Sequence, residues 1–180
     1  MPSEHEQATK LDDATLALSQ TLGTAFRRRR LTLGIAESAT GGLIGHVLTE
    51  VPGSSDYFVG DVIAYSNAIK TDLLHVPKTV LERHGAVSGE AAAAMAQGIR
   101  ELLGTDVGLA STGIAGPTGA TPSKPVGLVY VAVELAASNP VVRHYEFNGS
   151  RSSLKTQFAR AALQLLLDLV EGRVAVPQSS

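Results

Sequence analysis

Five short apolar segments alternate with longer segments of helical periodicity along this chain. Apolar runs of this length, bounded by glycine, proline and small polar residues, are typical of buried strands. Because helical segments separate most of them, the pattern predicts a sheet with helices on both faces. The predicted strands are residues 31–36, 58–65, 106–111, 128–135 and 141–147. The predicted helices are residues 11–29, 43–50, 67–74, 78–84, 89–103 and 150–170.

The link between the last two predicted strands decides the sheet type. Residues 136–140 are too few for a crossover helix, so these two strands must pair antiparallel. The earlier strands are joined through helices, which is typical of parallel pairing. The sequence therefore predicts an α/β fold with a mixed, mostly parallel sheet.

One folded domain is expected over residues 11–171, because 180 residues fall within the roughly 100–200 residues of a single domain. Residues 1–10 are polar and acidic and are interpreted as a disordered leader, and residues 172–180 as a loose tail. The leader has no apolar core of a secretory signal, and no run approaches the roughly 18 apolar residues of a membrane span. We therefore expect no membrane association and a cytoplasmic location.

Composition argues against several classes of partner and cofactor. The 15 basic and 17 acidic residues leave no basic excess of the kind that nucleic-acid binding requires. With no cysteine, disulfides, thiolate nucleophiles and Cys-based zinc sites are excluded. The five histidines show no metal-ligand spacing and are interpreted as surface or capping residues, so neither metal nor cofactor is expected. The apolar final helix leaves a homo-oligomer open, although packing on its own sheet is the favoured use.

Three loops of polar or small residues follow the first three predicted strands. They are residues 37–42, 65–70 and 112–119. In sheets of this class, ligands bind beyond the carboxyl ends of the parallel strands. We therefore expect these three loops to meet at one edge and form the site.

The first of these loops contains Ser38, and a serine needs a neighbouring base to become a nucleophile. No histidine is expected at this edge, whereas Lys70 lies one turn past the second loop. A buried lysine can have its pKa lowered and act as the base, although a solvated lysine on an exposed helix is the alternative. The glycines after Ser38 leave N–H groups at a helix start that can bind an anion or simply accept an ordinary cap.

Taken together, these segments resemble the CinA C-terminal domain family, which includes stand-alone nicotinamide mononucleotide deamidases. The resemblance covers nearly all of the expected folded part, in the family's order and spacing. One departure is Ala39, where many members have cysteine. The matching motifs are Ala36-Glu37-Ser38-Ala39-Thr40-Gly41-Gly42, Gly53-Ser54-Ser55, Tyr65-Ser66-Asn67 with Lys70, His84-Gly85-Ala86-Val87-Ser88, Thr112-Gly113-Ile114-Ala115-Gly116-Pro117, Lys124-Pro125-Val126-Gly127, and Gly149 with Arg151.

The resemblance implies a three-layer α/β/α sandwich with a five- or six-stranded sheet and an amidohydrolase without cofactor. Its substrate is the small nucleotide nicotinamide mononucleotide. Ser38 is then the nucleophile, Lys70 its base, and Tyr65 the residue that orients Lys70 or the nicotinamide ring. N–H groups near residues 40–42 or 112–113 are expected to stabilise the oxyanion. The implied substrate-binding residues are Glu37, Thr40, Gly41, Gly42, Ser66, Asn67, Thr112, Gly113 and Arg151.

Arg151 is the candidate for the 5′-phosphate, because a guanidinium matches phosphate geometry with two parallel hydrogen bonds. A surface arginine at a helix terminus is the alternative for this residue. Two other functions stay open at this stage: a nucleotide-binding module without catalysis, and a serine hydrolase that acts on a different amide.

Overall fold

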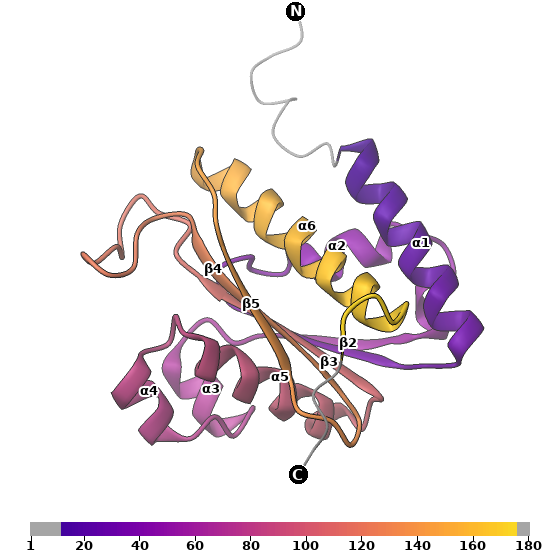
Figure 1. The fold of residues 1–180 in the computed structure, drawn as a ribbon, viewed down its shortest axis with the longest axis horizontal. Helices are drawn as coiled ribbons and strands as arrows, with labels where there is room; N and C mark the ends of the chain where they lie inside the picture. Colours follow the sequence, from indigo (N-terminus) through magenta and orange to yellow (C-terminus); the bar gives the residue numbers. More distant parts are fainter. Residues whose placement is uncertain (1–11, 176–180) are drawn as a thin grey trace, which may run out of the picture.

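The computed structural model describes residues 12–175 and contains a five-stranded sheet between two layers of helices (Figure 1). The strands are β1 (Leu33–Glu37), β2 (Phe58–Ile63), β3 (Val107–Gly113), β4 (Leu128–Leu135) and β5 (Val141–Glu146). The helices are α1 (Asp13–Arg29), α2 (Leu43–Thr49), α3 (Asn67–Asp72), α4 (Lys78–His84), α5 (Gly89–Leu103) and α6 (Arg151–Val170), with a short 3-10 helix η2 (Ser54–Asp56).

The sheet order is β2-β1-β3-β4-β5. β1 pairs parallel with β2 and β3, whereas β4 pairs antiparallel with β3 and β5. Four strands therefore point in one direction and β4 in the other, which confirms the predicted mixed three-layer fold. Several predicted boundaries were wrong by one or two residues; for example, β2 ends at Ile63 instead of residue 65, and β3 continues to Gly113 instead of ending at residue 111.

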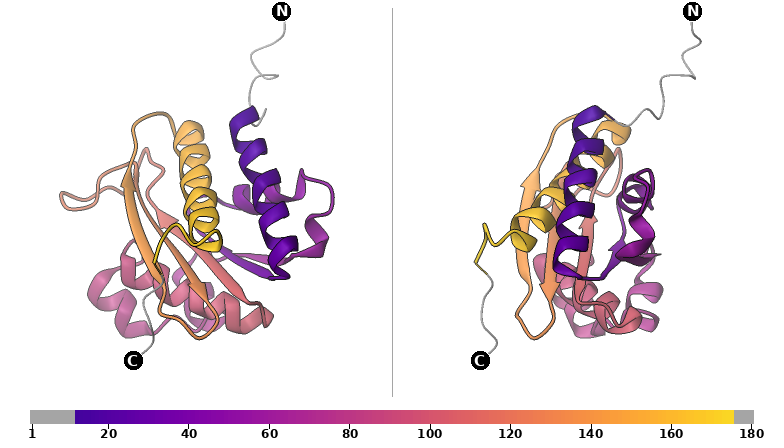
Figure 2. Two further views of the ribbon diagram at one scale, coloured as in Figure 1. Left: turned by 45° about the vertical axis from the view of Figure 1, so that its right-hand side comes forward. Right: turned by 90° about the vertical axis from the view of Figure 1, so that its right-hand side faces the viewer.

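Each face of the sheet is covered by its own set of helices. α1, α2 and α6 lie on one face and α3, α4 and α5 on the other, as the two views of Figure 2 also show. Successive strand residues point to opposite faces. In β1, Leu33 and Ile35 join the core under α1, α2 and α6, whereas Ala36 joins the core under α5. Among the buried strand residues, leucine, isoleucine and valine thus gather on one face and alanine on the other.

The small residues let α5 approach the sheet closely. A Cβ atom at Gly108 in β3 would lie 2.1 Å from the Ala96 carbonyl oxygen of α5. Side chains of alanine, Met95 and Ile99 on α5 fill the remaining space. The alanine-rich sequence of α5 is therefore explained by this close helix-to-sheet contact.

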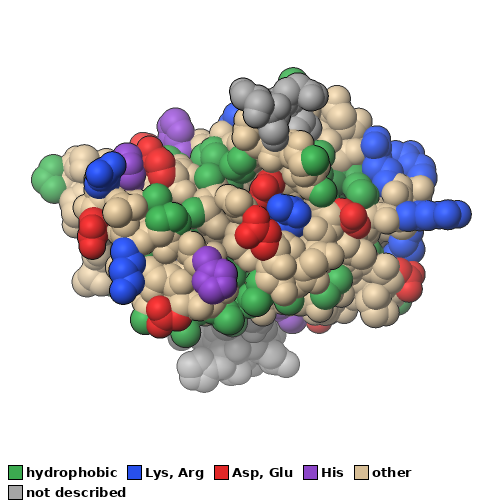
Figure 3. Space-filling model, turned by 90° about the horizontal axis from the view of Figure 1, so that it is seen from below, with side chains coloured by type: hydrophobic (Ala, Val, Ile, Leu, Met, Phe, Trp, Pro, Cys, Tyr) green, Lys and Arg blue, Asp and Glu red, His purple; other side chains and the backbone are tan. Residues whose placement is uncertain are grey.

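The final helix packs on its own sheet, as favoured from the sequence. Leu154, Phe158, Leu165 and Leu169 of α6 are all buried in the core. The predicted leader, residues 1–10, lies outside the described residues, as does most of the predicted tail. No helix within residues 12–175 is long and apolar enough to cross a membrane. Basic and acidic side chains are mixed over most of the face shown in Figure 3.

Candidate active site

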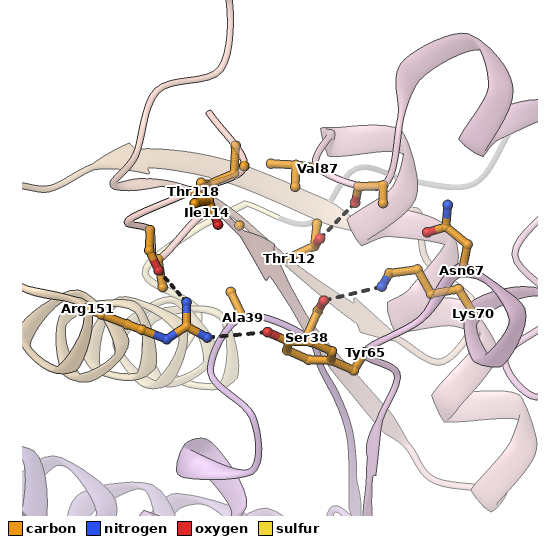
Figure 4. Close-up of a pocket in the computed structure, with 15 residues that line it drawn as sticks. Ser38, Ala39, Tyr65, Asn67, Lys70, Val87, Thr112, Ile114, Thr118 and Arg151 are labelled. Atoms are coloured by element: carbon orange, nitrogen blue, oxygen red, sulfur yellow. Dashed lines mark hydrogen bonds between the residues drawn. The ribbon is translucent and has the colours of Figure 1, made fainter. Parts of the chain in front are cut away.

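A pocket of about 310 Å³ opens at the carboxyl ends of β1 and β3, beside the loop that follows β2 (Figure 4). This is the edge where the three polar loops were expected to meet. The pocket is lined by Ser38, Ala39, Tyr65, Asn67, Lys70, Ala86, Val87, Thr112, Gly113, Ile114, Ala115, Gly116, Thr118, Gly119 and Arg151.

Ser38 follows the last residue of β1 and lies at the floor of the pocket. The chain turns immediately after it, because the Gly41 N–H donates to the Ser38 carbonyl at 3.1 Å. Gly41 and Gly42 both have positive φ angles, +61° and +92°, which a residue with a side chain rarely adopts. The pair of glycines is thus needed for the turn that leads from β1 into α2.

Lys70 comes from α3 and is almost completely buried, with 1% of its surface exposed. Its Nζ lies 3.2 Å from Ser38 Oγ and donates to the Ala64 carbonyl at 2.6 Å, as Figure 4 shows for Ser38. Burial lowers the pKa of the Lys70 ammonium. A buried amine favours its neutral form, because the charged form loses its hydration. A neutral Lys70 can accept the proton of the Ser38 hydroxyl, so the pair can generate a nucleophile.

Tyr65 and Arg151 form the outer rim of the pocket. Arg151, the first residue of α6, donates to the Gly116 carbonyl and, at 3.3 Å, to the Tyr65 hydroxyl. Tyr65 is 64% exposed, and its hydroxyl is directed to Arg151 and not to Lys70 (Figure 4). Of the two expected roles of Tyr65, orienting Lys70 is therefore wrong in this structure.

Thr112 and Gly113, the last two residues of β3, form part of the pocket wall. The Thr112 hydroxyl donates to the Ala86 carbonyl at 2.7 Å and so ties β3 to the segment before α5. A Cβ at Gly113 would lie 2.7 Å from the Leu128 carbonyl oxygen, so the neighbouring strand requires glycine here. Asn67 lines the opposite side, at the start of α3.

The geometry can be compared with known proteins. The family model of the CinA C-terminal domain matches residues 15–170. The chain belongs to the CinA C-terminal domain family. It is 52% identical over 149 residues to a CinA-like protein of Salinibacter ruber, an alignment that covers 83% of this chain and 36% of that protein. The chain thus spans about a third of the length of the curated relatives that it matches.

Solved structures of the CinA superfamily have the same fold. The competence/damage inducible protein CihA of Agrobacterium tumefaciens is 35% identical, with a TM-score of 0.83 over 89% of this chain and 98% of that chain. A CinA superfamily protein of Escherichia coli is 29% identical, also with a TM-score of 0.83, over 94% of this chain and 99% of that chain. These likenesses agree with the observed three-layer sandwich.

Five residues expected to bind substrate do not line the pocket of this CinA domain. Glu37 is completely buried, and its carboxylate accepts the N–H groups of Gly42 and Gly45. The Thr40 hydroxyl is buried against Ser111 Oγ at 3.0 Å. Gly41 and Gly42 use their N–H groups in the turn, so neither can serve as the expected oxyanion donor. Ser66 caps α3, because its Oγ accepts from the Ile69 N–H.

The sequence interpretation missed two features. The loop after β3 was expected at the edge, yet five of its residues that form pocket wall were not named: Ile114, Ala115, Gly116, Thr118 and Gly119. Asp61 of β2 was also missed. In the structure, burial next to Glu37 raises the pKa of the Asp61 carboxyl to about 8. The signal for Asp61 was an acidic residue on an inward-facing position of a strand, where apolar residues are the norm.

Among residues 12–175, no histidine lines the pocket. Within residues 12–175, no three side chains of the kind that ligate metals are grouped together. His46, His75, His84 and His144 are exposed, in agreement with their interpretation as surface or capping residues, and His5 lies outside the described residues. Ser38 and Lys70 are thus the reactive groups that the pocket presents.

Proposed function

We propose that this CinA domain is an amidohydrolase that converts nicotinamide mononucleotide and water to nicotinic acid mononucleotide and ammonia. The observation that carries the proposal is the buried Lys70 Nζ at 3.2 Å from Ser38 Oγ, at the floor of an open pocket. Membership of the CinA C-terminal domain family supports this choice of substrate.

In the first half of the reaction, Ser38 Oγ attacks the carboxamide carbon while neutral Lys70 takes the hydroxyl proton. The carbonyl oxygen becomes negatively charged in the tetrahedral intermediate. Lys70 then gives its proton to the amide nitrogen, the carbon–nitrogen bond breaks, and ammonia leaves an ester on Ser38. In the second half, a water attacks the ester as Lys70 takes its proton, and Ser38 recovers that proton as the acid product leaves.

The oxyanion needs hydrogen-bond donors that the turn does not already use. Ala39 lines the pocket directly after Ser38, and its N–H makes no backbone hydrogen bond within residues 12–175. The residue after the nucleophile supplies such a donor in other serine hydrolases. A donor of this kind contributes about 3 kcal/mol to transition-state stability.

Arg151 supports a substrate that carries a phosphate. Its guanidinium lies at the pocket rim, held by the Gly116 carbonyl and the Tyr65 hydroxyl. The Arg151 residue is exposed, so the remaining N–H groups can reach a ligand. We assign the 5′-phosphate to this guanidinium and the nicotinamide to the Ser38 end of the pocket.

The test is a product assay of purified wild-type, Ser38→Ala and Ser55→Ala proteins, in which ammonia and nicotinic acid mononucleotide are measured. Ser55 is exposed in η2 and is the matched control. We expect Ser38→Ala to lose roughly 10⁴-fold or more in kcat, because the covalent route is removed. Ser55→Ala should match wild type.

The same assay separates the alternatives. A wild-type protein that binds nicotinamide mononucleotide without releasing ammonia over hours would be a binding module and not an amidase. Equal turnover of nicotinamide mononucleotide and nicotinamide riboside would indicate a hydrolase of a different amide, since the phosphate would then play no part.

A further inference from the structure

A second pair of ionisable side chains lies directly behind Ser38, on the face of the sheet that α2 covers. Glu37 is the residue before Ser38, and Asp61 is on the neighbouring strand β2. In the β1–β2 register, Ile35 is opposite Asp61 and Glu37 is opposite Ile63. Because residues two apart share a face, the side chains of Glu37 and Asp61 project into the same space.

The Glu37 carboxylate fixes the chain between Ser38 and Gly45 through two hydrogen bonds. Its Oε2 accepts the Gly42 N–H at 2.9 Å, and its Oε1 accepts the Gly45 N–H at 2.8 Å. The turn between Ser38 and Gly42 is therefore anchored through one carboxylate to the first turn of α2. A displacement of this carboxylate would move Ser38 Oγ relative to Lys70 Nζ.

Asp61 approaches Glu37 from the other side. Both carboxyl groups lie against Gly45 of α2, and two carboxyl groups in one space are stabilised when they share one proton. Both Glu37 oxygens already accept N–H groups, so the proton belongs on Asp61. Asp61 Oδ1 is buried and has no partner within residues 12–175, and a Cβ at Gly45 would lie only 2.6 Å from Oδ2. The Asp61 carboxyl is thus confined by α2 and β1.

Burial, which is the largest cause, and the hydrogen-bonding and negative charge of the adjacent Glu37 together raise the pKa of Asp61 to about 8. The other elements against β2 carry His46 and Glu50 on α2, Asp56 on η2, and Arg100 on α5. His46 is directed to Glu50, and Arg100 to Glu101 and Glu134. Glu37 is the charged group that acts on Asp61.

We propose that Asp61 is a positioning residue that works in its protonated form, donates to Glu37 and so keeps the Ser38 turn in place. Loss of this proton puts two negative charges behind the nucleophile, displaces Glu37 and lowers the reactivity of Ser38 at alkaline pH. This inference rests on the proposed role of Ser38 as a nucleophile, but not on the identity of the substrate.

The test compares wild type with Asp61→Asn, Asp61→Ala and the matched control Asp56→Asn, an exposed position in η2. Asparagine is neutral at every pH and can still donate to Glu37. Two rates are measured from pH 6 to 9: hydrolysis of nicotinamide mononucleotide, and modification of Ser38 by phenylmethanesulfonyl fluoride, followed by mass spectrometry. The second rate reports on Ser38 without a substrate.

We expect Asp61→Asn and wild type to react at similar rates at pH 6 to 7. At pH 9 the Asp61→Asn rate should exceed the wild-type rate about tenfold, since a group with a pKa of about 8 is then about one-tenth protonated. Asp61→Ala should be slower than wild type at pH 7, and Asp56→Asn should follow wild type throughout.

The outcomes separate the two proposals. If Asp61→Asn keeps the wild-type alkaline fall, or Asp61→Ala reacts like wild type, the positioning role is wrong even if nicotinamide mononucleotide is hydrolysed. If the sulfonyl fluoride rates follow the expected pattern but nicotinamide mononucleotide is not hydrolysed, the proposed substrate is wrong and the positioning role stands. A Ser38 that reacts with neither compound overturns both proposals.

Discussion

Lys70 is a buried and Asp61 a half-buried ionisable side chain, and both lie close to the Ser38 turn but on opposite faces of the sheet. Lys70 belongs to α3, on the side that α5 covers, and Asp61 points to the side that α2 covers. Burial favours the neutral form of each: it lowers the pKa of Lys70 and raises that of Asp61 to about 8. The two groups differ in what surrounds them.

The difference is access to a ligand. Lys70 Nζ contacts the Ser38 hydroxyl at the floor of an open pocket, whereas the half-buried Asp61 carboxyl does not line that pocket and lies against Gly45 of α2. A neutral amine beside a cavity can exchange a proton with a reacting group. An acid outside the pocket has no contact with a substrate and can only keep neighbouring protein groups in position. A shifted pKa therefore indicates a catalytic role only where a substrate can reach the group.

The largest expected effect tests Lys70, the group that lines the open pocket. Replacing Lys70 by methionine keeps the length of the side chain and removes the base, so kcat should fall by about 10²–10⁴-fold. Lys78→Met, an exposed position at the start of α4, is the matched control and should retain full activity. Ammonia release from nicotinamide mononucleotide measures both variants.

The same variant has a distinct pH signature. Because the Lys70 pKa is lowered, wild-type kcat should rise with pH as Lys70 loses its proton, and Lys70→Met should lack this rise. The free energy of unfolding should also rise with pH. The stability that neutral Lys70 contributes is fully present above the unfolded pKa near 10.5 and is lost as pH falls through the lowered pKa of the folded state. A variant with the wild-type pH–rate curve would place the base elsewhere.

The contrast also explains how far the sequence could be interpreted. Alternating apolar and helical segments predicted the five strands and six helices, because periodicity reports burial directly. Ser38 and Lys70 were expected at the same sheet edge, but the choice of Lys70 as the base over a solvated lysine came from the family resemblance, since a separation of 32 positions carries no distance information. The enclosed role of Glu37 could not be predicted, because it depends on which way the side chain leaves β1. Asp61 stands out in the sequence as an acidic residue in a predicted strand, but its closeness to Glu37 follows only from the β1–β2 register.

A smaller effect is expected for Arg151, at the rim of the pocket that contains Ser38 and Lys70. Arg151→Ala should raise KM for nicotinamide mononucleotide by about 10–100-fold, as expected for the loss of charged hydrogen bonds of about 1.5–3 kcal/mol. Turnover of nicotinamide riboside, which has no phosphate, should change little. Arg160→Ala is the matched control: it lies on the same helix, is exposed and pairs with Asp12 at 2.8 Å. Equal losses with both substrates would argue for a structural role of Arg151.

The smallest expected effect tests how closely α2 packs against the Asp61 carboxyl. Gly45→Ala adds a methyl group 2.6 Å from Asp61 Oδ2, and overpacking of this kind costs about 1–3 kcal/mol. The gain in helix propensity offsets at most about 1 kcal/mol, so a net loss of about 1 kcal/mol is expected. Thermal and denaturant unfolding measure this difference.

Gly89→Ala is the matched control, because Gly89 also lies in a helix but its added methyl group would come no closer than 3.3 Å to Val142 Cγ1 and 3.7 Å to the Tyr130 ring. We expect its stability to stay within about 0.5 kcal/mol of wild type. If Gly45→Ala is as stable as this control, Asp61 can move aside at no cost. A carboxyl that moves freely could not hold Glu37 in place. Lys70 and Asp61 would then differ in their access to a substrate but not in the rigidity of their surroundings.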